Sequence, residues 1–184
     1  MRNILILNGC PGSGKDTVSD YLVANYNYKT IAFKDSAYKA VYEHYNITKE
    51  EYMSLYNDRD LKDKPSELLE GHSPRSAMQY VIEQVKKPKY GKDYLAKATI
   101  EIIQKDVYND YVISDLGLPE EEIAVHYYLR KEKYQIIYIN RNGYDFSKDT
   151  RSKRQIIHNT IDNNSDLDHL YKQVDKILKN NKEA

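Results

Sequence analysis

Short apolar runs alternate along this chain with longer segments in which apolar residues recur at helical spacing. The runs that predict strands are residues 3–7, 29–33, 110–114 and 134–140, with a shorter one at 158–163. The segments that predict helices are 17–23, 36–45, 93–104, 119–130 and 167–178, with further helices beginning after Thr48 and after Ser73. Strands that alternate with helices in this order are typical of an α/β fold built around a parallel sheet.

Local signals mark where two of these helices begin. Thr48 is followed three residues later by Glu51, which is the pattern of a capping box. Ser73 precedes Pro74, the combination expected for an N-cap and the first residue of a helix. Residues 142–155 instead are polar and rich in Lys and Arg, and they predict a mobile loop.

Composition and charge narrow the class of protein. A chain of 184 residues is the size of one domain. Lys plus Arg and Asp plus Glu both number 28, so the net charge is zero and argues against broad binding to nucleic acid or membranes. Cys10 has no partner for a disulfide, which fits a reducing compartment. With no visible signal peptide or membrane span, we expect a cytoplasmic protein.

The segment "GCPGSGKDT" (residues 9–17) is the strongest chemical signal in the chain. It follows an apolar run and precedes a helical segment, which is the context that a phosphate-binding loop requires. Glycines let backbone N–H groups converge on phosphate oxygens, and a lysine adds a mobile positive charge. The alternative is a tight turn with a solvated lysine. We expect ATP to bind at Gly9, Gly12, Ser13, Gly14, Lys15, Asp16 and Thr17.

The residue after the lysine is usually Ser or Thr, but here it is Asp16, with Thr17 one place along. Two interpretations of Asp16 stay open: an anion favoured by the helix dipole, or an acid that orients Mg²⁺. Asp115 ends an apolar run and would lie at the ligand-facing edge of the sheet, where it could hold Mg²⁺ or merely form a turn. The candidate metal ligands are therefore Asp16, Thr17 and Asp115.

The loop is similar to the G-x-P-G-x-G-K-G-T loop of nucleoside monophosphate kinases, and "SGKDT" resembles the phage-type deoxynucleoside monophosphate kinase family. Further pieces appear in that family's order: "FKDS", "LKDKP", "SPRSAMQ", "GKDYLAKA", "VISDLGLPEE", "IIYINR" and "IDNNSDLDHLYKQVDKIL". The resemblance implies a single P-loop kinase domain (1–184) with a helical acceptor-binding insertion (34–110) and a short lid (142–155). It also implies transfer of the γ-phosphate of ATP, with Mg²⁺, to a (deoxy)nucleoside monophosphate in deoxynucleotide metabolism. A homodimer, and the host cytoplasm for a phage-encoded chain, are compatible with it.

The resemblance implies roles for residues of the acceptor-binding segment. The fork of Arg75 matches a phosphate, and Gln79 lies one helical turn further on the same face, where an amide can read a base edge. Lys62 could add charge toward the phosphate, and Phe33 and Tyr94 could stack on the base. The alternatives are surface ion pairs for the polar residues and core packing for the two aromatic ones.

Three arginines could neutralise the phosphoryl group in transit. Arg141 follows a predicted strand, and Arg151 and Arg154 lie in the polar loop. In related kinases, residues placed like Asn163 hold adenine. The candidate catalytic residues are therefore Lys15, Asp16, Arg75 and Arg141, with Arg151 and Asn163 as further contacts to ATP.

The chain departs from the family pattern two residues after Asp115, where relatives commonly have arginine and this chain has Gly117. This departure puts substrate specificity or activity in question. Three alternatives stay open: a kinase of a small non-nucleotide acceptor, a non-catalytic nucleotide-binding regulator, and a kinase of nucleic-acid ends, which the neutral net charge disfavours. The sequence does not reveal which base or sugar is accepted.

Overall fold

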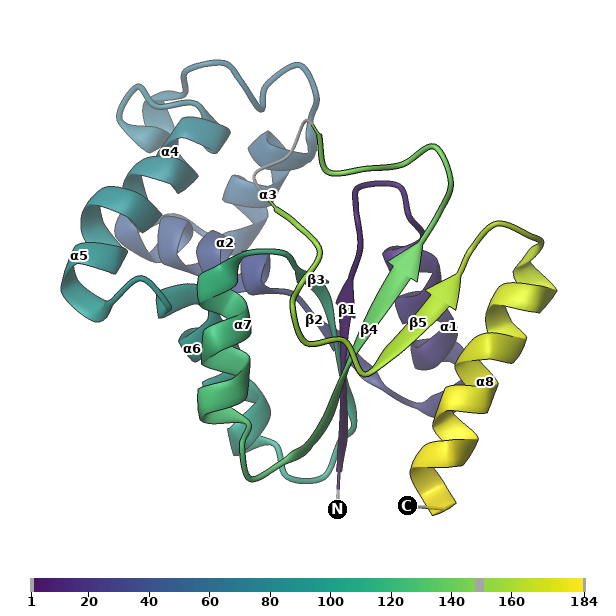
Figure 1. Cartoon of the computed structure of the whole chain (residues 1–184). Helices are drawn as coiled ribbons and strands as arrows, with labels where there is room; N and C mark the ends of the chain where they lie inside the picture. Colours follow the sequence, from purple (N-terminus) through teal and green to yellow (C-terminus); the bar gives the residue numbers. More distant parts are fainter. Residues whose placement is uncertain (1, 148–150, 184) are drawn as a thin grey trace. The chain divides into compact units, whose positions relative to one another are not determined.

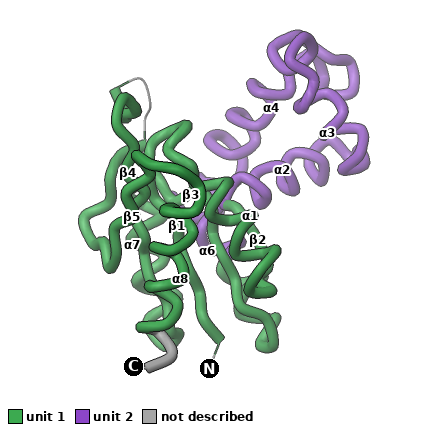
Figure 2. Tube along the Cα trace, turned by 90° about the vertical axis from the view of Figure 1, so that its right-hand side faces the viewer, with its two compact units in different colours: residues 1–32, 100–184 green, residues 33–99 purple. Residues whose placement is uncertain are grey.

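The computed structural model describes residues 2–147 and 151–183, and the chain divides into two compact units (Figure 1, Figure 2). Unit 1 consists of residues 1–32 and 100–184, and unit 2 consists of residues 33–99. Each unit has a hydrophobic core of its own, so each is described by itself.

The described residues of unit 1 form a five-stranded sheet in the order β2-β3-β1-β4-β5, and every pair of neighbours is parallel. The strands are β1 (Asn3–Asn8), β2 (Lys29–Ile31), β3 (Tyr111–Leu116), β4 (Lys133–Asn140) and β5 (Asn159–Asp162). The central strand β1 is buried from Ile4 onward, as expected where helices cover both faces of a parallel sheet. The predicted α/β class with a parallel sheet is confirmed.

Helices cover the sheet of unit 1 on its two faces (Figure 1). They are α1 (Lys15–Tyr26), α7 (Pro119–Tyr128) and α8 (Leu167–Glu183), while α6 (Tyr94–Lys105) contains the boundary between the units. On one face, Leu5 and Leu7 of β1 join a core with Leu22 of α1 and Val174 of α8. Alternate residues of the strand therefore anchor the helix that begins at the phosphate loop.

Unit 2 is helical throughout its described elements. They are α2 (Phe33–His44), α3 (Lys49–Asn57), a 3-10 turn (Glu67–Leu69), α4 (Pro74–Tyr80), a π-helical segment (Val81–Lys86) and α5 (Lys87–Tyr90). Tyr52 lies at the centre of the core with none of its surface exposed, and its hydroxyl donates to the carbonyl of Pro74 at 3.1 Å. This bond satisfies the one polar atom of a buried tyrosine and joins α3 to α4.

Both predicted caps are present. Thr48 Oγ1 accepts from the Glu51 N–H at 3.1 Å, and Glu51 Oε2 accepts from the Thr48 N–H at 2.7 Å. Ser73 Oγ accepts from the Ser76 N–H at 3.2 Å, with Pro74 as the first residue of α4. These bonds satisfy N–H groups that the first turn of a helix leaves without partners.

The predicted strand at 29–33 is too long. Pairing with β3 stops at Ile31, and Phe33 is the first residue of α2. Phe33, Ala37 and Val41 are buried at helical spacing along α2, so the apolar residue at 33 belongs to the period of the helix.

Among the described residues, no helix combines the length and apolar character that crossing a bilayer requires.

Candidate phosphate-binding site

The loop between β1 and α1 needs glycine for two reasons. Gly12 and Gly14 have φ values of +79° and +104°, in the left-handed region that favours glycine. The space beside them is also filled: a Cβ on Gly12 would lie 2.4 Å from Cε1 of Tyr144, and one on Gly14 would lie 2.3 Å from Nδ2 of Asn163. Any side chain at these positions would strain the backbone and displace a neighbour.

Two residues from other strand ends hold the loop through its carbonyl groups. Asn163, just after β5, donates from Nδ2 to the carbonyl of Ser13 at 2.8 Å. Arg141, just after β4, donates to the carbonyl of Gly12 at 3.0 Å and lies over the ring of Tyr144, 4.8 Å from its centroid. The structure therefore brings the predicted residues Arg141 and Asn163 to the predicted loop, where both contact its backbone.

The start of α1 has the features of an anion site. Gly14 at the N-cap position provides no side-chain cap for the first turn. Ser13 Oγ is buried and has no hydrogen-bond partner among the described residues. Uncapped N–H groups at a helix start, together with the helix dipole, are a common way of binding phosphate. The loop thus fits the phosphates of a nucleotide.

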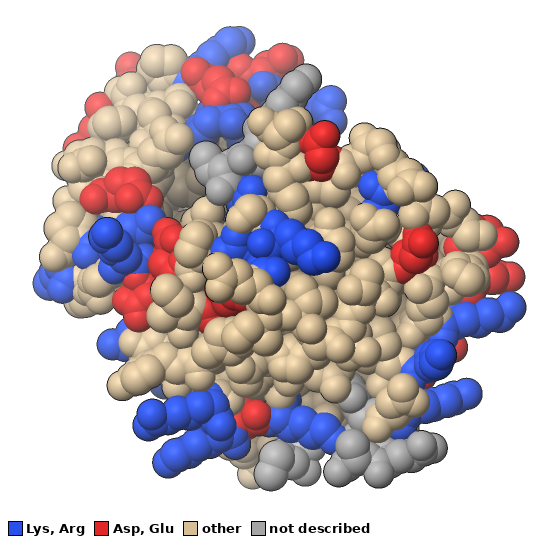
Figure 3. All heavy atoms as spheres, viewed as in Figure 1, with Lys and Arg blue, Asp and Glu red and all other residues tan. Residues whose placement is uncertain are grey.

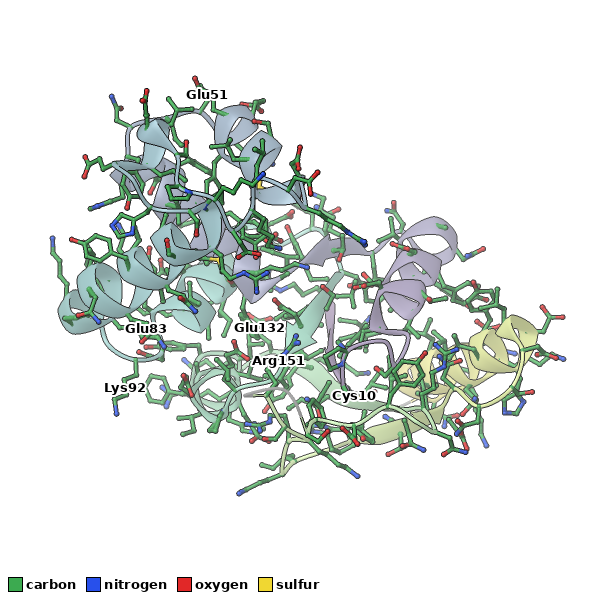
Figure 4. All side chains as sticks on the ribbon, turned by 90° about the horizontal axis from the view of Figure 1, so that it is seen from above. Cys10, Glu51, Glu83, Lys92, Glu132 and Arg151 are labelled. Carbon is green, nitrogen blue, oxygen red and sulfur yellow. The ribbon has the colours of Figure 1, made fainter. Side chains whose placement is uncertain are left out.

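Lys15 lies folded back over the loop. Its Nζ donates to the carbonyls of Gly9 at 2.7 Å and Cys10 at 2.9 Å. Burial lowers the pKa of Lys15 below its ordinary value, and the positive charge of Arg151 adds to this effect. Figure 4 labels Arg151, whose charge acts on Lys15, and Cys10, whose carbonyl accepts from Lys15 Nζ. The positive charges of Lys15 and Arg151 repel each other, and a polyanion that binds between them would turn this repulsion into attraction.

The candidate metal ligands come from the start of α1 and the end of β3. Asp16 is exposed in the first turn of α1, Thr17 is half-buried beside it, and Asp115 is half-buried near the end of β3. Both carboxylates act on Lys15 by raising its pKa, against the effect of burial. In the described part of the chain, no three His, Cys, Asp or Glu side chains group into a metal site. Asp16, Thr17 and Asp115 offer only oxygen donors, the kind that Mg²⁺ takes together with nucleotide phosphates and water, and binding of Mg²⁺ here stays a prediction.

The predicted acceptor residues Phe33, Lys62, Arg75, Gln79 and Tyr94 all belong to unit 2. The structure brings Lys62 and Arg75 together: the Arg75 N–H donates to the carbonyl of Lys62 at 3.2 Å. The guanidinium of Arg75 is exposed and pairs with Asp63, with Nε 2.8 Å from Oδ1. Lys62 Nζ lies over the ring of Tyr56, 3.8 Å from its centroid.

The other three acceptor residues differ in exposure and in the elements that carry them. Gln79 is exposed on α4, and Tyr94 starts α6 and stacks on Tyr90 with ring centroids 5.6 Å apart. Phe33 is buried. Contact of these residues with an acceptor stays a prediction.

The predicted lid at 142–155 includes residues 148–150, which lie outside the described residues. Its last part is tied to unit 1 by buried polar groups. Arg154 is only 6% exposed. Its backbone N–H donates to Asn8 Oδ1 at 3.1 Å, and its side-chain Nε donates to the carbonyl of Ser152 at 3.0 Å. Glu122 Oε1 accepts from the N–H groups of Gln155 and Ile156, both at 3.0 Å.

Sequence reasoning missed several residues that shape this site: Asn8, Glu121, Glu122 and Tyr144. The signal for Asn8 was available, because a polar residue ends an otherwise apolar run directly before the first loop glycine. Glu121 accepts from N–H groups three and four positions before it, at the start of α7, so its contacts are local. Glu122 and Tyr144 form contacts with segments far away in the chain, which no local pattern reveals.

Charged side chains of both signs lie on the face of the molecule shown in Figure 3. In both units, acidic and basic side chains are interspersed on the face shown in Figure 3. On this face the mixture agrees with the net charge of zero.

Comparison with known proteins identifies the fold. No protein-family model and no curated protein matches the sequence. Solved structures do match. APS kinase CysC of Mycobacterium tuberculosis, in complex with AMPPNP and APS, has a TM-score of 0.53 at 8% identity, with 97% of this chain and 98% of that chain covered. The Cys556Ala mutant of the same enzyme has a TM-score of 0.50 at 9% identity, with 97% of each chain covered. TT1252 of Thermus thermophilus has a TM-score of 0.54 at 13% identity, again with 97% of each chain covered.

The chain therefore has the α/β fold of the P-loop kinases, as predicted. At these identities the likeness establishes the fold, and the acceptor has to be inferred from the chain's own residues.

Proposed function

We propose that this protein is a P-loop kinase that transfers the γ-phosphate of ATP to a nucleoside or deoxynucleoside monophosphate. The observation that carries the proposal is the uncapped start of α1 behind a loop of left-handed glycines, with Lys15 folded over that loop. The binding of AMPPNP by a protein of similar fold supports ATP as the donor. The ordered resemblance to monophosphate kinases supports the acceptor class.

In this reaction an oxygen of the acceptor phosphate attacks the γ-phosphorus of ATP, the bond to the β-phosphate oxygen breaks, and ADP leaves. Lys15 moves its ammonium from the carbonyls of Gly9 and Cys10 to the phosphates. Asp115, with Asp16 or Thr17, would hold Mg²⁺ together with the phosphates, and the bound ion would neutralise further negative charge. Arg141 and Arg151 add positive charge where the transferred group passes.

The acceptor is assigned to unit 2. Arg75 binds its phosphate by exchanging the carboxylate of Asp63 for a phosphate, since a guanidinium fork matches both groups. Lys62 adds a second cation, and Gln79, Tyr94 and Phe33 are the candidates for contact with the base. A small non-nucleotide acceptor remains the main alternative within the kinase class.

A steady-state screen tests this proposal. All common ribonucleoside and deoxynucleoside monophosphates, and APS because a protein of similar fold binds it, are incubated with ATP and Mg²⁺, and ADP formation is measured. We expect turnover of at least one monophosphate, and its loss by more than a hundredfold in Lys15→Met. Lys172→Met, an exposed lysine on α8, is the matched control and keeps full activity. Tight ATP binding without transfer to any acceptor would instead identify a nucleotide-binding regulator.

The role of Asp16 needs a separate measurement. If its carboxylate orients Mg²⁺, Asp16→Asn weakens the apparent affinity for Mg²⁺ and lowers turnover. If it is only a favourable anion at the helix start, the variant loses about 0.5 kcal/mol of stability and keeps its dependence on Mg²⁺. A titration of activity against Mg²⁺ concentration separates the two interpretations.

A further inference from the structure

Gly117 provides space rather than backbone freedom. Its φ lies outside the left-handed region, so other residues could adopt its conformation. A Cβ at this position, however, would lie 2.5 Å from both Cγ and Cδ of Arg151 and 2.8 Å from its Cβ. The first carbons of the Arg151 side chain therefore pack directly against the Cα of Gly117. These carbons are close to the backbone and have less freedom to move than the end of a long side chain.

The residue after Arg151 is tied to the same place through its backbone. The N–H of Ser152 donates to the carbonyl of Gly117 at 3.0 Å. The carbonyl of Ser152 accepts from Nδ2 of Asn8 at 3.1 Å. The same Nδ2 also donates to the carbonyl of Leu116 at 2.9 Å. Both backbone groups of Ser152 are thus bonded to the carboxyl ends of β1 and β3.

These contacts have a rigid base. Asn8 is fully buried, pairs with Leu116 across the sheet, and immediately precedes the first glycine of the phosphate loop. On the other side, Glu121 Oε2 accepts from the N–H groups of Gly117 and Leu118, both at 2.8 Å. The attachment point of Arg151 is therefore held from two strands and from the start of α7.

We propose that Gly117 and Asn8 are positioning residues that fix Arg151 at the carboxyl edge of the sheet as a stationary cation of the phosphate site. Arg151 contacts the phosphates of the bound nucleotide without a closing movement, and Gly117 is small because this arginine occupies the space beside it. The effect of the Arg151 charge on Lys15 supports the placement. A cation held in place before binding loses less side-chain entropy than a mobile one. The proposal rests on the proposed function for its ligand, but its geometry is independent of the acceptor.

Binding of inorganic tripolyphosphate, measured by calorimetry without metal, tests the proposal independently of phosphate transfer. We expect Arg151→Gln and Gly117→Ala each to weaken binding about tenfold, the effect of one charge-assisted hydrogen bond. The double variant should bind no more weakly than Arg151→Gln, because Gly117→Ala acts only through the arginine. Lys153→Gln removes the same charge two residues away, where Nζ lies over the ring of Tyr138, and binds within about twofold of wild type.

Hydrogen exchange shows whether the substitution acts locally. In Gly117→Ala we expect faster exchange at Ser152, whose N–H bond to Gly117 is disturbed, and unchanged exchange in β1. Wild-type affinity in Gly117→Ala beside a loss in Arg151→Gln would overturn the positioning role, as would additive losses in the double variant. Wild-type affinity in Arg151→Gln would overturn the role of the arginine itself.

The outcomes separate this proposal from the proposed function. If no monophosphate is turned over but the tripolyphosphate pattern holds, the positioning role stands and the assigned acceptor fails. If monophosphates are turned over and all variants bind tripolyphosphate equally, the positioning role fails alone. A wild-type protein that binds no tripolyphosphate contradicts the positioning role, and the monophosphate screen decides the proposed function separately.

Discussion

The buried carboxyl of Glu121 makes stability depend on pH in a direction that can be measured. Glu121 is only 7% exposed, and burial raises its pKa from 4.5 to about 7, although two backbone N–H groups favour the charged form. Because the pKa in the folded protein is above that of the unfolded chain, the stabilising contribution is complete below pH 4.5 and is lost as the pH rises through about 7. A pKa difference of one corresponds to about 1.4 kcal/mol, so the whole change is about 3 kcal/mol.

Glu121→Gln removes this titration while keeping the size and an acceptor oxygen. We therefore expect the free energy of unfolding of the variant, relative to wild type, to increase by about 3 kcal/mol between pH 4.5 and pH 8. Urea unfolding at five or six pH values measures it. Burial also lowers the pKa of His158, an effect of the opposite sign that is present in both proteins and cancels in the difference. Glu101→Gln, an exposed glutamate on α6, is the control and should show no trend. A difference between Glu121→Gln and wild type that does not change with pH, or falls as the pH rises, would refute the reasoning.

Three further predictions concern stability and use the same unfolding measurement. Leu7→Ala empties a fully buried position of the sheet and should cost about 3 kcal/mol, whereas a loss below 1 kcal/mol would contradict its place in the core. Thr48→Ala removes the cap of α3 and should cost about 1 kcal/mol, with Thr160→Ala on an exposed strand position as a neutral control. Tyr52→Phe leaves the Pro74 carbonyl without its 3.1 Å partner and should cost about 1 kcal/mol, and an unchanged stability would show that the bond contributes nothing.

Much of the fold was predictable because its signals are local. Apolar runs identified each strand. The capping box at Thr48, and Ser73 as an N-cap before Pro74, marked two helix starts that the structure confirms. The strand predicted at 29–33 is present but ends at Ile31, because Phe33 belongs to the period of a helix that continues to Val41. Periodicity in a short window cannot decide between a strand end and a helix start when the residues fit both.

The candidate site was predictable only in part. Residues 9–17 were identified from spacing, and Arg141 and Asn163, chosen separately, lie against that loop. The sequence offered no reason to join Asn8, Gly117 and Arg151, since these residues lie in segments more than thirty positions apart. Their meeting depends on strand order and register, which are properties of the assembled sheet.

By itself, the sequence determined the order of strands and helices, the place of the loop at residues 9–17 between a strand and a helix, and the glycines that this loop requires. These features follow from hydrophobic period and backbone sterics, which act between neighbouring residues. Only the tertiary structure decided what lies beside Gly117. The sequence has glycine where related kinases commonly have arginine, and in the structure the side chain of Arg151, from a distant segment, fills the space beside it. Gly117 and Arg151 are distant in the sequence, and they meet only because the folded sheet brings both to the same edge.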